Sequence, residues 1–195
     1  MKLIFATNNK HKVREIASLL DDSYTVLGLN DVDISEDIPE DGETLTDNAL
    51  HKARYVYERT GMNVFADDTG LEVDELNGAP GVHSARFAGE NKDPDANITK
   101  LLGLLDGKSN RKARFRTVIA LIFNKKEYLF EGTVEGEIIN VRKGTEGFGY
   151  DPVFLADGYE QTFAEIPLSE KNKISHRARA TRKLINFLST HHQPQ

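Results

Sequence analysis

Short apolar runs alternate along the chain with segments whose apolar residues recur at helical spacing, and this pattern predicts a mixture of strands and helices. The runs at 3–6 and 64–66 are typical of buried strands. Apolar residues three and four positions apart predict helices that begin near residues 10, 44, 95 and 175. The second run is expected to end abruptly at Asp67, where a polar stretch begins.

Local signals mark the boundaries of two of these elements. Thr44-Leu45-Thr46-Asp47 resembles a capping box with Asp in place of Glu, and Gly61 suits the position after a helix, so we expect one helix between them. Between 114 and 130, two runs rich in β-branched and aromatic residues flank the turn Asn124-Lys125-Lys126-Glu127. This arrangement predicts a long antiparallel hairpin.

The order of these elements predicts an α/β fold. Strand–loop–helix units of the parallel type come first and the hairpin comes later, which indicates a mixed β-sheet flanked by helices, with two lobes and a central ligand-binding cleft. The length of 195 residues fits a single domain, 1–195. The tail from Thr190 shows no pairing pattern, and we expect it to be frayed.

Composition excludes several classes of protein. The absence of Cys removes disulfides, thiolate metal sites and cysteine nucleophiles, and it suits a reducing, cytoplasmic compartment. No apolar run approaches the ~20 residues of a membrane helix, so we expect no membrane partner. The net charge of -6 argues against binding a nucleic acid polymer, although it does not argue against a single nucleotide.

The segment Thr7-Asn8-Asn9-Lys10-His11-Lys12 links the first predicted strand to the first helix. Such a turn aims backbone N–H groups and the positive end of a helix dipole at one point, which suits a phosphate, and Lys12 adds a full charge. The Walker glycine pattern is missing, so this is not a P-loop. The alternative is that Thr7 or Asn8 only caps the helix while the lysines are solvated.

Asp67 and Asp68 directly follow a predicted buried strand, where α/β folds place their chemistry. Two adjacent carboxylates repel each other unless a cation or hydrogen bonds offset the repulsion. Mg²⁺ is the expected cation, because one or two carboxylates plus substrate phosphates commonly hold it, and the acidic loop at 36–43 offers a further ligand. The alternative is an Asp-rich turn without a ligand.

In Gly147-Phe148-Gly149-Tyr150-Asp151-Pro152, glycines flank aromatic residues. This composition lets a backbone and a ring face approach a flat ligand closely, and an aromatic ring stacks on any base. Asp151 is suited to accept a hydrogen bond from a base N–H. The alternative is an aromatic turn that leads into a strand at 153–155.

A strongly basic run extends from Ser169 to Lys183. Most of it is typical of a solvated helix face. We expect Lys171, His176 and Arg177 to lie in or near the turn before the last helix, where their donors point at an anionic or oxo-bearing ligand.

Together these segments supply a phosphate cradle, a Mg²⁺ site with a candidate base, a stacking platform and donors for an oxo group, which are the parts of a nucleotide hydrolase. From Phe5 to about Leu188 the chain resembles the non-standard purine nucleoside triphosphate pyrophosphatases, the inosine triphosphatase or dITP/XTP pyrophosphatase family. The motifs that carry the resemblance are, in order, Ala6-Thr7-Asn8-Asn9-Lys10-His11-Lys12, Ala66-Asp67-Asp68-Thr69-Gly70-Leu71, Gly78-Ala79-Pro80-Gly81-Val82-His83-Ser84-Ala85-Arg86, Gly147-Phe148-Gly149-Tyr150-Asp151-Pro152 and Ser175-His176-Arg177.

The resemblance implies a cytoplasmic homodimer that uses Mg²⁺ to hydrolyse ITP, dITP and XTP to the monophosphate and pyrophosphate, and so cleanses the nucleotide pool. It implies that a central cleft binds the nucleotide, that Asp68 is the metal-linked proton acceptor and that Glu40 is a metal ligand. The residues that it assigns to the substrate are Thr7, Asn8, Asn9, Lys10, His11 and Lys12 for the triphosphate, Thr69 as a further contact, and Phe148, Gly149, Tyr150, Asp151, Lys171, His176 and Arg177 around the base.

Two positions depart from the family pattern. Asn8 stands where many members have Gly, and Thr69 stands where many have Ser, but both keep a small polar group. Two other functions stay open on the sequence: a pyrophosphatase for other modified nucleotides, and a non-catalytic purine nucleotide-binding module.

Overall fold

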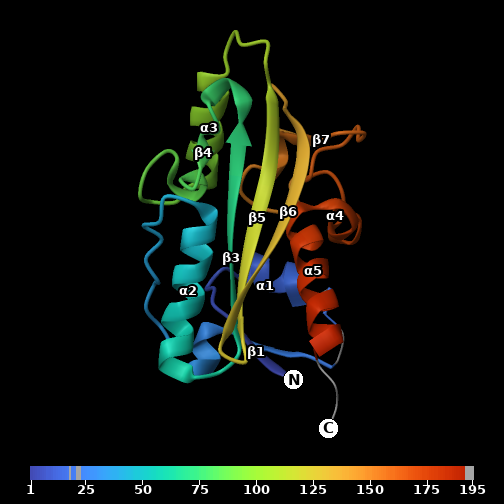
Figure 1. Cartoon of the computed structure of the whole chain (residues 1–195). Coiled ribbons are helices and arrows are strands. Elements are labelled where there is room, and N and C mark those ends of the chain that lie inside the picture. Colours follow the sequence, from blue (N-terminus) through green and yellow to red (C-terminus); the bar gives the residue numbers. More distant parts are fainter. Residues whose placement is uncertain (18, 21–22, 192–195) are drawn as a thin grey trace. The chain divides into compact units, whose positions relative to one another are not determined.

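The computed structural model of the chain describes residues 1–17, 19–20 and 23–191, and its strands form one sheet flanked by helices (Figure 1). The strand order is β2-β1-β3-β5-β6-β7, and β4 pairs with β3. The strands are β1 (Lys2–Phe5), β2 (Thr25–Leu27), β3 (Val64–Val73), β4 (Pro80–Gly81), β5 (Lys112–Phe123), β6 (Lys126–Ile138) and β7 (Phe154–Ala156). The α-helices are α1 (Lys10–Ala17), α2 (Leu45–Thr60), α3 (Pro94–Leu104), α4 (Leu168–Ile174) and α5 (His176–His191).

The sheet is mixed, as the sequence predicts. β1 pairs in parallel with both β2 and β3, whereas β4 and β7 pair antiparallel with β3 and β6. The predicted hairpin is also confirmed: β5 and β6 are joined by Asn124 and Lys125, whose φ angles are +49° and +65°. Two consecutive residues with positive φ form a tight turn whose twist matches that of the strands.

The chain divides into two compact units. Unit 1 contains residues 1–68, 117–132 and the chain from 177, and unit 2 contains 69–116 and 133–176. These units correspond to the two expected lobes, while the cleft and the single domain stay predictions. Thr190 and His191 close α5, and the rest of the tail that we expected to be frayed lies outside the described residues.

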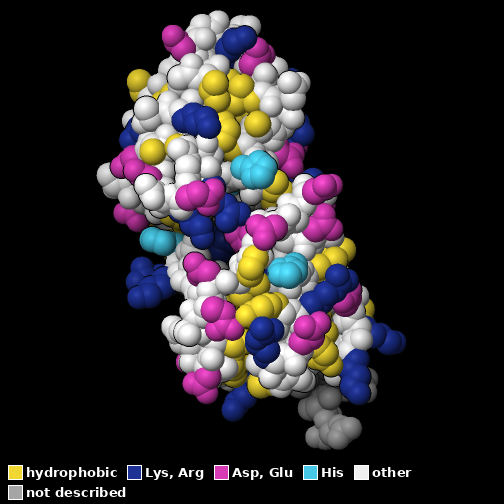
Figure 2. Space-filling model, turned by 90° about the vertical axis from the view of Figure 1, so that its left-hand side faces the viewer, with side chains coloured by type: hydrophobic (Ala, Val, Ile, Leu, Met, Phe, Trp, Pro, Cys, Tyr) yellow, Lys and Arg dark blue, Asp and Glu magenta, His cyan; other side chains and the backbone are white. Residues whose placement is uncertain are grey.

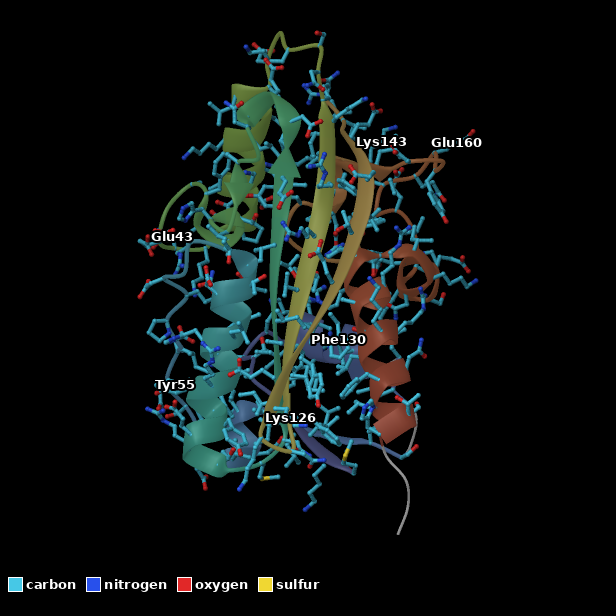
Figure 3. All side chains as sticks on the ribbon, viewed as in Figure 1. Glu43, Tyr55, Lys126, Phe130, Lys143 and Glu160 are labelled. Atoms are coloured by element: carbon cyan, nitrogen blue, oxygen red, sulfur yellow. The ribbon has the colours of Figure 1, made fainter. Side chains whose placement is uncertain are left out.

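The core of unit 1 forms between the strands and two helices. Phe5 stacks on Phe65 with ring centroids 4.5 Å apart, and this cluster includes Ile16 of α1 and Leu184 of α5. Phe130 of β6 lies toward α5, where it meets the Phe187 ring (Figure 3). α2 lies on the other side of the strands from α5 (Figure 1). The strands of unit 1 are therefore covered on both faces.

The core of unit 2 is rich in aromatic rings. Phe115 of β5 contacts Phe154 and Phe163, and the His176 ring stacks on Phe115 at 4.6 Å. α3 adds Ile98 and Leu101 to the same cluster. His176, which we expected in or near the turn before the last helix, is the first residue of α5 and part of this aromatic core.

Charged side chains of both signs are interspersed on the face that Figure 2 displays. Exposed ion pairs also occur among the described residues, such as Arg54 with Glu127 at 2.7 Å. Exposed pairs of this kind stabilise a protein by at most about 1 kcal/mol each, so the two cores provide most of the stability. No described helix has the length and apolar character needed to cross a membrane.

The expectation that the second strand ends at Asp67 is wrong, because β3 continues without a break to Val73. The two aspartates therefore lie in the middle of a buried strand. Their carboxylates have cationic and amide partners inside the protein, so the backbone can stay in the sheet.

The boundary signals of α2 are confirmed. The Thr44 hydroxyl accepts a hydrogen bond from the Asp47 N–H at 3.1 Å, and Gly61 ends the helix with φ +64°. We expect Thr44→Ala to lower the free energy of unfolding by about 1 kcal/mol, measured by urea denaturation, because one backbone donor at the helix start loses its partner. Thr46→Ala, inside the helix, is the control, and an equal loss in the control would contradict this assignment.

Candidate active site

The two adjacent aspartates of β3 point to opposite faces of the sheet, because side chains alternate along a strand. Asp67 meets Lys12 and Arg177, whereas Asp68 meets Asn48 and Lys52. This alternation, together with separate partners, removes most of the repulsion that two neighbouring carboxylates would otherwise have. All of these residues belong to unit 1.

Asp67 uses each carboxylate oxygen for a different cation. The Lys12 Nζ lies 2.9 Å from Oδ1, the Arg177 Nε lies 3.2 Å from Oδ2, and the Asp67 side chain is fully buried. Burial alone would raise the pKa of Asp67, but the charges of Lys12, Arg177 and Lys52 outweigh it and hold that pKa well below its usual value. Asp67 is therefore ionised at neutral pH.

Asp68 lies in a different environment. The Asn48 amide donates to its Oδ2 at 2.9 Å, and the Lys52 Nζ lies 3.9 Å from its Oδ1. Burial raises the pKa of Asp68, although Lys52 and Lys12 oppose this effect. A carboxylate whose pKa lies above the ordinary value is a better proton acceptor than its neighbour, so the two aspartates are suited to different roles.

The Lys52 ammonium joins Asp68 to the loop before α2. It contacts the Glu40 carboxylate and donates to the backbone oxygen of Asp67 at 2.7 Å. Burial would lower the pKa of Lys52, but Asp68, Glu40 and Asp67 raise it by more. Glu40 and Asp68 therefore face one shared positive charge.

This donor set fits a hard divalent cation. Two carboxylates, from Glu40 and Asp68, approach the same ammonium, and Mg²⁺ is commonly held by one or two carboxylates plus phosphate oxygens of a substrate. The residues that the structure describes contain no cluster of three or more His, Asp or Glu side chains with metal-binding geometry. A cation at this position would therefore need oxygen atoms from a ligand to complete its coordination.

The turn between β1 and α1 is held by its own side chains. The Asn9 side chain accepts hydrogen bonds from the backbone N–H groups of His11 and Lys12, at 2.9 and 3.3 Å, and the Thr7 hydroxyl accepts from the Asn9 N–H. The helix cap is thus Asn9, whereas the alternative from the sequence was a cap at Thr7 or Asn8. The Asn8 amide instead donates to Asp37 at 3.4 Å.

Two helices of unit 1 begin with cations. Neither α1 nor α5 has an acidic residue in its first turn, and Lys12 and Arg177 lie there instead. A helix N-terminus carries a partial positive charge, so a cation at this position is unfavourable without an anion nearby. Asp67 is that anion for both cations, and the two positive helix ends favour a phosphate in addition.

A second buried charge pair lies in unit 2. The Lys171 Nζ contacts the Asp151 carboxylate at 2.7 Å, and both side chains are almost fully buried. The same ammonium lies 5.1 Å from the Phe148 ring and 5.7 Å from the Phe163 ring, within the range of cation–π interactions. Lys171 is on α4, which ends at Ile174, just before the start of the last helix.

The loop that carries Asp151 is held in place by short-range contacts. Asp151 accepts from the Phe148 N–H at 2.9 Å, and a side chain at Gly147, where φ is +75°, would collide with the Asp151 carboxylate. The Tyr150 hydroxyl donates to the Ser84 backbone oxygen at 2.8 Å, and burial raises the pKa of Tyr150. This hydroxyl is therefore used to fix the loop.

The predicted site residues fall into two groups. Unit 1 holds Thr7 to Lys12, Glu40, Asp68 and Arg177; unit 2 holds Thr69, Phe148 to Asp151, Lys171 and His176. Arg177, which we expected beside the base-contacting residues, lies against Asp67 of unit 1.

The sequence analysis missed Asn48 and Lys52. Both lie on the buried side of α2, four residues apart, among the apolar residues that face inward. A polar residue that recurs on the apolar face of a helix is a usable signal, because burying an amide or an ammonium requires a partner.

Comparisons with known proteins show which family the chain is similar to. The sequence profile of the Ham1 family matches residues 3–187. The chain is 52% identical to the dITP/XTP pyrophosphatase of Flavobacterium johnsoniae, covering 97% of this chain and 98% of that protein, and 53% identical to the one of Porphyromonas gingivalis, covering 96% and 97%. The structure of the Staphylococcus aureus Ham1 protein is similar to this one with a TM-score of 0.90 and 38% identity, covering 98% of this chain and 100% of that one.

The buried pair of unit 2 leads to a prediction about stability. Lys171→Met removes the ammonium and leaves the Asp151 carboxylate buried without it, so we expect the free energy of unfolding to fall by about 3 to 5 kcal/mol. Lys173→Met, on the same helix, is the control: its pair with Glu170 is exposed, and we expect a change below about 1 kcal/mol. Similar losses in both variants, measured by chemical denaturation, would contradict the prediction.

Proposed function

The chain belongs to the Ham1 family, and we propose that it hydrolyses non-standard purine nucleoside triphosphates, namely dITP, XTP and ITP, to the monophosphate and pyrophosphate. Relatives with 52–53% identity over nearly the whole chain carry the name dITP/XTP pyrophosphatase. The observation that carries the chemistry is the position of Asp68, buried beside Lys52 and Asn48 in the same unit as Lys12 and Arg177.

We propose that unit 1 binds the triphosphate. Three cations, Lys12, Lys52 and Arg177, are there balanced by the carboxylates of Asp67, Asp68 and Glu40. Two helix N-termini with cations in their first turns favour additional negative charge. In the segment from Thr7 to Lys12 the N–H groups of Asn9, His11 and Lys12 already have side-chain acceptors, so the cations and the helix dipoles would provide most of the neutralisation of a chain of phosphates.

Glu40 and Asp68 are the proposed ligands of Mg²⁺. When bound, Mg²⁺ supplies charge neutralisation at the phosphate oxygens. Its need for further oxygen ligands agrees with a substrate that brings phosphates to the site.

Asp68 is the proposed general base. It accepts a proton from the water that attacks the α-phosphorus. The bond from the α-phosphorus to the oxygen that bridges it to the β-phosphorus breaks, and pyrophosphate leaves. Asn48 holds one carboxylate oxygen, and Lys52 lies near the other, so the orientation of the acceptor is fixed before the substrate arrives.

Unit 2 supplies the proposed base recognition. Inosine and xanthine carry an oxo acceptor at C6, where adenine carries an amino donor. The Lys171 ammonium can donate only, so it favours the former, and the Phe148 ring beside it offers a face for stacking. A site that hydrogen-bonds one group of its substrate can discriminate against an analogue that lacks this group by about 10⁴-fold in kcat/KM.

The cellular setting is part of the same proposal. The lack of Cys supports a reducing cytoplasmic compartment, and the resemblance to the family supports a homodimer that cleanses the nucleotide pool.

A substrate panel tests the proposed function. With Mg²⁺ present, we expect kcat/KM for ITP, dITP and XTP to exceed that for ATP by at least about 10²-fold, with pyrophosphate and not orthophosphate released. Chelation of the metal with EDTA should abolish turnover. Equal rates for dTTP or UTP would favour a pyrophosphatase of other specificity, and binding of ITP without turnover would favour a non-catalytic module.

Replacing the proposed base gives a second test. Asp68→Asn keeps the size of the side chain and its ability to form hydrogen bonds, but it removes the proton acceptor. We therefore expect kcat to fall by about 10² to 10⁴-fold while the circular dichroism spectrum is unchanged. Asp74→Asn, which removes a surface carboxylate next to Arg114, should keep the parent rate. A nearly normal kcat for Asp68→Asn would exclude this residue as the base.

A further inference from the structure

We propose that Asp67 is a positioning residue, which holds the Lys12 ammonium on one carboxylate oxygen and the Arg177 guanidinium on the other, in the orientation that triphosphate hydrolysis requires. This proposal rests on the proposed function, because it gives Lys12 and Arg177 their roles toward the substrate.

The geometry separates Asp67 from the reacting atoms. Its side chain is 0% exposed, and its two oxygens lie 2.9 Å from Lys12 Nζ and 3.2 Å from Arg177 Nε. A side chain buried in this way does not contact a substrate. Asp67 acts on the reaction through the two cations that it holds.

The two cations come from distant parts of the chain. Lys12 lies 55 residues before Asp67 and Arg177 lies 110 residues after it, each in the first turn of its own helix. These two positive charges repel each other, and each is also repelled by the positive end of its own helix dipole. The Asp67 carboxylate is the negative charge that lies between them in unit 1, so it keeps both cations at fixed positions.

Lys52 gives a way to separate this role from a general loss of charge. Its ammonium donates to the backbone oxygen of Asp67 at 2.7 Å, and its charge faces Asp68 and Glu40. Asp67→Asn leaves that backbone contact in place. The variant therefore affects Lys12 and Arg177 directly, while the surroundings of Asp68 keep their partners.

The central variant is Asp67→Asn, measured with the preferred triphosphate. An amide of the same size offers one oxygen in place of two, so one of the two cations faces an NH₂ group and moves. A displacement of about 1 Å can cost about 10²-fold in rate, and we expect a fall in kcat of this size. KM should stay equal or decrease, because the site loses a negative charge and keeps its cations.

A second variant is the reference for the loss of a phosphate-binding cation. Lys12→Met removes the ammonium itself, so we expect it to weaken the binding of inorganic tripolyphosphate, measured by calorimetry, by at least tenfold. Asp67→Asn should bind tripolyphosphate at least as tightly as the parent protein. If Asp67→Asn instead loses affinity to the same degree and keeps its kcat, the proposal is overturned.

Coupling between the residues provides the decisive measurement. If Asp67 acts through the two cations, then Asp67→Asn should lower kcat by less than about tenfold in the Lys12→Met or the Arg177→Met background, against about 10²-fold in the parent. The same hundredfold fall in both backgrounds would overturn the proposal. Asp67→Asn/Lys12→Met keeps the net charge of the cluster, so this comparison also decides the matter if Asp67→Asn alone does not fold.

The control is Glu72→Gln on the same strand. Its carboxylate also lies near two arginines, at 3.4 Å from Arg116 and 3.8 Å from Arg114, but outside the proposed site. We expect its kcat and KM to equal those of the parent protein. Turnover of the parent on the substrate panel is measured first, so a failure of the proposed function is seen there, and a failure of the Asp67 proposal is seen only in the variants.

Discussion

Ionised carboxylates inside a β-strand need partners, and much of unit 1 follows from this requirement. Asp67 and Asp68 occupy consecutive positions of β3, where Asp67 is 1% and Asp68 is 7% exposed. The alternation of a strand sends one to each face, so partners must come from both sides of the sheet. α1 and α5 supply Lys12 and Arg177 on one side, and α2 supplies Asn48 and Lys52 on the other. The helices that bury the core thus also neutralise the site.

The same rule operates in unit 2 with different chemistry. There a single carboxylate, Asp151, meets a single ammonium, Lys171, and aromatic rings enclose the pair. Around Asp67 and Asp68, unit 1 holds several buried charges of both signs, whereas the described pair of Asp151 and Lys171 in unit 2 is buried among aromatic rings. In the proposed function, the first environment serves the phosphates and the second serves a flat heterocycle.

Sequence patterns predicted the parts of the fold that depend on local signals. The capping residue Thr44, the stop at Gly61 and the β5–β6 hairpin all follow from short-range chemistry, and the structure confirms them. The extent of β3 was not predictable in this way, because Asp67 reads as a strand terminator until the distant Arg177 is known to pair with it. The partners of Asp68 were missed for the same reason. Motifs suggested which residues belong to the candidate site. The pairing of these residues depends on contacts between remote segments, which the motifs do not contain.

The wide separation of Asp67 from Arg177 has a consequence for biosynthesis. A ribosome that adds about 5 to 20 residues per second needs roughly 5 to 20 s to pass from one to the other, a distance of 110 residues. During that interval Lys12 is already present, while the second counter-ion of Asp67 has not been made. The buried centre of unit 1 therefore cannot be completed until α5 has been made, because Asp67 lacks its second cation until then.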